Sequence, residues 1–124
     1  MQSYLTDRKR ALGTGAGRHG THHHWQMMAS STALVFLVPL FVFTFANGLG
    51  GTYEEVVAYY SRPFPAIITG LTLVVVILHL VREAQVAIED YVHGVAEKLS
   101  LMAVAAFGYT LMAAGLFALV KLAL

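Results

Sequence analysis

Cysteine is absent from this chain of 124 residues. Without a thiol the chain cannot form a disulfide, hold zinc through thiolates, ligate an iron-sulfur cluster or use a cysteine nucleophile. A redox centre held by this chain would have to use histidine, another ligand without sulfur, or methionine.

Charged residues are also scarce, at 12% of the chain, whereas hydrophobic residues make up 57%. A water-soluble domain of this size could not bury so much apolar surface. In a lipid bilayer, apolar side chains can face outward while the backbone polar groups satisfy one another within helices. The composition therefore predicts an all-α integral membrane protein.

A concentrated basic face is missing as well, since 8 Lys and Arg against 7 Asp and Glu leave a formal net charge of +1. Nucleic-acid binding needs such a face, so we expect no DNA or RNA partner. The segment 1–26 is polar, glycine-rich and basic, and we expect it to form an N-terminal tail. Roughly fifteen weakly polar residues separate its basic cluster from the first apolar stretch, which is unlike a signal peptide.

Three apolar stretches predict membrane spans at about 27–46, 63–91 and 99–120, within a transmembrane domain over 27–124. Each is long enough to cross about 30 Å of hydrocarbon, which needs about 20 helical residues. Three spans place the two termini on opposite sides of the membrane. Between the first two spans, EEVVAYY at 54–60 is expected to form an interfacial helix. The tyrosines suited to the headgroup layer are Tyr53, Tyr59 and Tyr60.

Basic residues resist translocation, so their positions predict the orientation of the spans. Most of them fall in the tail and in the connection between the second and third spans: Arg8, Lys9, Arg10, Arg18, Arg82 and Lys98. The other side has only Arg62 and Lys121. We therefore expect the N-terminus and the 82–98 connection to face the cytoplasm, or the matrix of a mitochondrion.

The second span carries a histidine, His79, and then an Asp-Tyr pair, Asp90 and Tyr91. If the helix continues to residue 91, His79 and Asp90 lie on one face, about 16 Å apart along the axis. An imidazole in hydrocarbon needs a hydrogen-bond partner or a metal, and the residue type alone leaves both open. The Tyr91 phenol can donate a hydrogen bond to a lipid-soluble acceptor, and Asp90 can orient neighbouring groups or relay protons. The alternative is that Tyr91 only anchors the helix at the membrane interface and that Asp90 is a solvated acid.

This spacing resembles the hydrophobic membrane-anchor subunit of succinate dehydrogenase, respiratory complex II, of the D-subunit type. In that family a haem ligand histidine is followed eleven and twelve residues later by Asp-Tyr, as His79 is by Asp90 and Tyr91. The stretch QVAIEDYVHG is similar to proteobacterial members, and GTHHHWQMMASSTALVFLVPLF resembles the start of the family's first span. The resemblance covers roughly residues 15 to 120.

The resemblance implies a subunit that does not catalyse alone but anchors a flavoprotein and an iron-sulfur subunit in a bacterial inner membrane. Electrons would pass from succinate to ubiquinone. His79 would supply one axial ligand to the iron of a b-type haem. The other ligand would come from a second, cytochrome b556-type anchor subunit, with which the three helices would form a bundle. Tyr91 would donate a hydrogen bond to a ubiquinone carbonyl, with Asp90 beside it.

Two positions depart from the pattern of the family. Members commonly have Arg two residues before a Thr-Ala pair, where this chain has Ser30, and often have Gly four residues after the haem histidine, where it has Glu83. His24 and Arg82 are candidates for contacts with a haem propionate, and Arg82 could instead pair with Glu83.

A different class of function is a purely structural three-span anchor, in which the histidine of the second span packs without ligating haem. A third class, a small transporter, would be indicated by paired charges within the membrane or by a repeat, and the sequence has neither.

Overall fold

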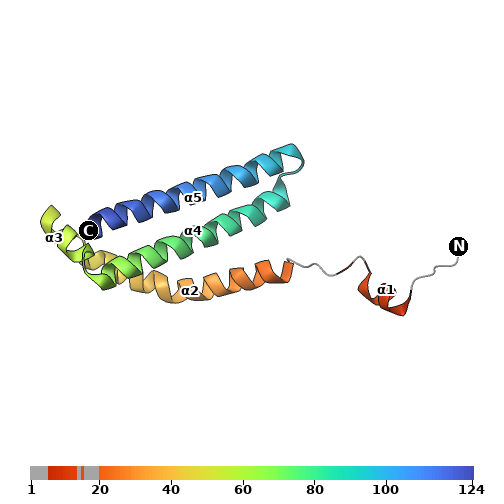
Figure 1. Cartoon of the computed structure of the whole chain (residues 1–124), viewed down its shortest axis with the longest axis horizontal. Coiled ribbons are helices and arrows are strands. Elements are labelled where there is room, and N and C mark those ends of the chain that lie inside the picture. The colour runs from red at the N-terminus through yellow and green to blue at the C-terminus, as the bar shows by residue number, and fades with distance from the viewer. Residues whose placement is uncertain (1–5, 14, 16–19) are drawn as a thin grey trace.

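The computed structural model describes residues 6–13, 15 and 20–124. Five helices follow one another in this part of the chain (Figure 1): α1 (Asp7–Leu12), α2 (Gly20–Asn47), α3 (Tyr53–Tyr60), α4 (Pro63–Tyr91) and α5 (Val95–Ala123). Of these, α2, α4 and α5 are long and apolar enough to cross a membrane. The predicted all-α architecture with three membrane-spanning helices is confirmed. Residues 1–5, 14 and 16–19 of the predicted N-terminal tail lie outside the described residues.

Helix α4 is central, with α2 packed along one side and α5 along the other (Figure 1). The backbones of α2 and α5, both fully described, do not approach each other. The three helices therefore form an open layer and not a closed bundle. Large apolar side chains such as Phe36, Phe43 and Phe107 remain exposed on it. Lipid tails or the helices of another subunit can cover such a surface, because the backbone polar groups of the helices are already satisfied and the exposed side chains are apolar.

The ends of the helices do not coincide with the ends of the apolar stretches. Helix α2 begins at Gly20. Its first turns therefore contain Gln26 and the three consecutive histidines at 22–24, which the sequence analysis assigned to the tail. His22 and Gln26 lie one turn apart and their side-chain nitrogens, both Nε2, are 2.8 Å from each other. Hydropathy marks only the apolar part of a helix, whereas the backbone hydrogen bonds continue through polar turns.

Helix α3 forms where the sequence predicted a short helix, and a capping box starts it. The Thr52 hydroxyl accepts from the Glu55 backbone N–H at 3.4 Å, and the Glu55 carboxylate accepts from the Thr52 N–H at 2.8 Å. Such reciprocal bonds satisfy donors that have no partner within the helix. They fix the start of α3 at the end of the loop that leaves α2.

The tyrosines of α3 differ in their surroundings. Tyr53 is exposed, but Tyr60 is buried, and the Tyr59 hydroxyl donates to the Thr44 carbonyl at 2.6 Å. Thr44 lies in the last turn of α2, where carbonyls have no partner within the helix. Burial, reinforced by Tyr59, raises the pKa of the Tyr60 phenol. Tyr59 and Tyr60 thus hold α3 against the rest of the protein, whereas Tyr53 is exposed.

Close approach between α4 and α5 depends on Gly108, which is buried. A Cβ atom at this position would collide with the Val81 side chain of α4. We expect Gly108→Val to separate the two helices and to cost about 1–3 kcal/mol of stability, as overpacking does. The melting temperature of the purified protein in detergent should fall, whereas Ala106→Val, on the exposed side of the same helix, should leave it close to the wild-type value. Equal melting temperatures for the two variants would contradict this role of Gly108.

Candidate functional site

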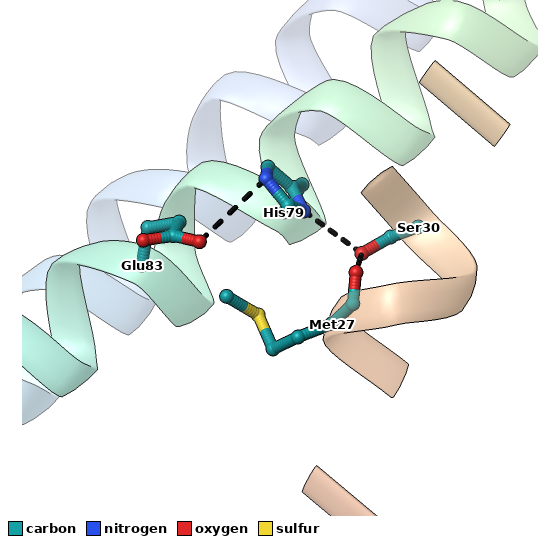
Figure 2. Close-up of polar contacts among 4 residues, drawn as sticks. All are labelled: Met27, Ser30, His79 and Glu83. Carbon is teal, nitrogen blue, oxygen red and sulfur yellow. Dashed lines mark hydrogen bonds and ion pairs between the residues drawn. The ribbon is translucent and has the colours of Figure 1, made fainter. Parts of the chain in front are cut away.

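His79 lies on the side of α4 that faces α2, and its side chain is only 15% exposed. Its Nδ1 atom is 2.8 Å from the hydroxyl oxygen of Ser30 on α2. The Ser30 hydroxyl in turn donates to the Met27 carbonyl, one turn earlier, at 3.0 Å (Figure 2). One ring nitrogen of this imidazole therefore has a fixed partner from another helix.

The second ring nitrogen, Nε2, faces Glu83 on the next turn of α4 (Figure 2). The distance from Nε2 to the carboxylate is 3.8 Å, which is too long for a hydrogen bond. The Glu83 side chain is 55% exposed and has room to turn away. Residues four apart on a helix share a face, whereas consecutive residues point about 100° apart. Glu83 accordingly approaches His79, and the alternative ion pair between Arg82 and Glu83 is not formed among the described residues.

Arg82 lies on the α2 side of α4. It lines a groove of about 260 Å³ between the two helices, and the groove is formed by Gln26, Ala29, Ser30, Ala33, Val75, Leu78 and Arg82. Ser30 and Arg82 thus border the same space.

The three consecutive histidines of α2 point in different directions. His22 bonds to Gln26 on the exposed side, and His24 is also exposed. His23 is half-buried, and its Nε2 atom is enclosed without a hydrogen-bond partner among the described residues. Residues 23, 27 and 30 share a helical face, so His23 lies on the side of α2 that carries Ser30. His24 is the candidate predicted from the sequence, and the seven-residue spacing between His23 and Ser30 is the signal that indicates His23.

Asp90 and Tyr91 end α4, because Val92 takes an extended backbone conformation and Gly94, with φ of 75°, turns the chain into α5. Both side chains are exposed, Tyr91 to 85%. Since α4 has no break between Pro63 and Tyr91, the separation of about 16 Å along its axis between His79 and Asp90 applies. The chain alone does not enclose the phenol, so a binding site there needs walls from another subunit.

A metal centre built only from side chains is not formed by the described residues, because they contain no cluster of three or more His, Cys, Asp or Glu suited to an ion. A haem makes a smaller demand, since the porphyrin supplies four ligands and the protein only the axial ones. His79 fits that demand: its ring is held through Nδ1, and Nε2 makes no hydrogen bond.

Comparison with known proteins agrees with this arrangement. The profile of a family described as "Succinate dehydrogenase/Fumarate reductase transmembrane subunit" matches residues 2–120. The succinate dehydrogenase hydrophobic membrane anchor subunit of Paracoccus denitrificans is 39% identical over 121 residues, which cover 98% of this chain and 94% of that protein. No solved structure matches the chain. The chain belongs to the family of succinate dehydrogenase/fumarate reductase transmembrane subunits, as a membrane anchor of the complex.

Proposed function

We propose that this anchor subunit contributes one haem ligand and part of the quinone site to a succinate:ubiquinone oxidoreductase. The observation that carries the proposal is the position of three side chains on α4. His79 is enclosed between α2 and α4 with Nε2 free of hydrogen bonds, and Asp90 and Tyr91 lie on the same unbroken helix at its end. Family membership supports the complex, and the geometry supports the division of roles within it.

His79 would hold the iron of a b-type haem, and such a haem would supply one-electron transfer within the membrane. Arg82 is placed to attract a propionate, because its side chain lines the groove beside Ser30. His24 is exposed on α2 and would reach a propionate only on the outer side of that helix. The enclosed Nε2 of His23 is a second candidate for such a contact.

Tyr91 would donate its hydroxyl proton in a hydrogen bond to a ubiquinone carbonyl and so polarise it for reduction. Asp90, the preceding residue, is exposed, and it would orient Tyr91 or pass protons toward the quinone. Because both side chains project from the protein, the partner subunits would close the site around the quinone headgroup.

The partners proposed are a second anchor subunit of the cytochrome b556 type, an iron-sulfur subunit and a flavoprotein subunit. The second anchor subunit would cover exposed helix surface, complete a bundle and supply the other axial ligand. The start of α2 and the α4–α5 connection lie at the same end of the layer (Figure 1). Arg82 and Lys98 are near this end, which supports a cytoplasmic N-terminus in a bacterial inner membrane.

The competing function is a structural anchor without haem. The hydrogen bond between His79 and Ser30 favours it, because a buried imidazole with a partner needs no metal. The intact complex, purified from membranes, distinguishes the two functions. We expect four subunits, a b-type band in the reduced-minus-oxidised spectrum and about one haem per flavin; a complex with flavin but no b-type band would support the structural anchor.

A further inference from the structure

The Ser30 hydroxyl lies between two hydrogen-bond partners, the Met27 carbonyl at 3.0 Å and Nδ1 of His79 at 2.8 Å, and it has a single proton. The carbonyl can only accept, whereas Nδ1 can donate or accept according to the tautomer of the ring. When the hydroxyl proton goes to the Met27 carbonyl, Nδ1–H donates to the Ser30 oxygen. In a neutral imidazole this arrangement leaves the lone pair on Nε2.

We propose that Ser30 is the positioning residue of His79, which holds Nδ1–H across the α2–α4 interface and so presents Nε2 as the ligating atom for haem iron. This inference rests on the proposed function, in which His79 is a haem ligand. An acceptor on the second nitrogen of a ligating histidine fixes the tautomer, orients the ring and makes the ligating nitrogen more basic. Ser30 and His79 are 49 residues apart in sequence, so two helices together fix the ring.

Glu83 does not fix the His79 ring through Nδ1. It approaches the opposite nitrogen, Nε2, at 3.8 Å, and its side chain is more than half exposed. A ligand bound at Nε2 would take the side that Glu83 faces, and the carboxylate can swing toward the surface. Only Ser30 meets Nδ1 at hydrogen-bonding distance in the described part of the chain.

A serine hydroxyl suits this position because it can accept a hydrogen bond from Nδ1–H, which a side chain that carries only donors could not do. Arg82 of α4 lines the same groove as Ser30.

Haem retention in the purified complex tests the proposal. We expect Ser30→Ala to release haem to excess apomyoglobin about tenfold faster than wild type, in line with the loss of other outer-shell partners. The low-spin electron paramagnetic resonance signal of the oxidised haem should also shift, because the ring can rotate. Ser31→Ala is the matched control, since Ser31 is the exposed neighbour. Ser30→Thr, which keeps the hydroxyl, should restore the wild-type rate.

Each outcome decides one question. A Ser30→Ala complex with wild-type haem release and an unchanged resonance signal overturns the positioning role and leaves His79 as a ligand. A His79→Ala complex that keeps the low-spin signal overturns the ligand assignment itself. If Ser30→Ala does not assemble, Ser30→Cys takes its place, because a thiol fills similar space but accepts only weakly. Wild-type haem release in that variant would equally overturn the positioning role.

Discussion

A complex that carries His79→Ala is expected to lose the six-coordinate, low-spin signal of its b-type haem. The side chain is enclosed between α2 and α4, and its Nε2 atom makes no hydrogen bond, so this atom is available to bind iron. Alanine offers no atom that binds iron. Reduced-minus-oxidised absorption and electron paramagnetic resonance, both normalised to flavin, measure the loss.

His93→Ala is the matched control for this experiment, because His93 is exposed in the α4–α5 connection. It should retain the full haem signal. Retention of the signal in the His79 variant as well would remove the ligand assignment and favour the structural anchor. Loss in both variants would indicate a general failure of assembly, which the flavin content of the membranes would register independently.

The second large effect is expected for Tyr91→Phe, which should lower succinate:ubiquinone reductase activity about tenfold to a hundredfold. Removing the hydroxyl deletes one donor to the quinone carbonyl and retains the ring, and a loss of this size corresponds to about 1.4–2.8 kcal/mol. Electron transfer from succinate to a soluble artificial acceptor should survive, because the flavoprotein and iron-sulfur subunits carry it.

Tyr53→Phe supplies the control, since it makes the same chemical change on an exposed residue of α3, at the opposite end of the layer. Both activities of that variant should match wild type. A Tyr91→Phe complex in which the two activities fall equally, or in which neither falls, would contradict a quinone role for the phenol.

Local signals in the sequence were sufficient for much of the fold. The apolar stretches predicted three membrane helices, Pro63 marked the start of α4, and EEVVAYY predicted a short helix that α3 confirms. The relation between His79 and Asp90 needed only helix geometry, because both lie on one element. The bounds of α2 were harder to predict, since Gly20 begins a helix whose first turns are polar.

The neighbours of His79 could not be predicted from local signals in the sequence. Ser30 could be noted as a departure from a family pattern, but its hydrogen bond to His79 joins two helices whose relative rotation no local pattern specifies. The same rotation encloses the Nε2 atom of His23 and leaves His24 exposed.

The sequence by itself determined that the protein lies in a lipid bilayer, how many helices span it and in which order the chemical groups follow along α4. These features depend on hydropathy and helical period, which are properties of consecutive residues. Only the tertiary structure decided that α4 packs between α2 and α5 in an open layer. It also decided that Ser30 of α2 contacts His79 of α4. These contacts follow from side-chain packing between helices, where the presence of a small residue such as Gly108 sets how closely and at what rotation two helices meet.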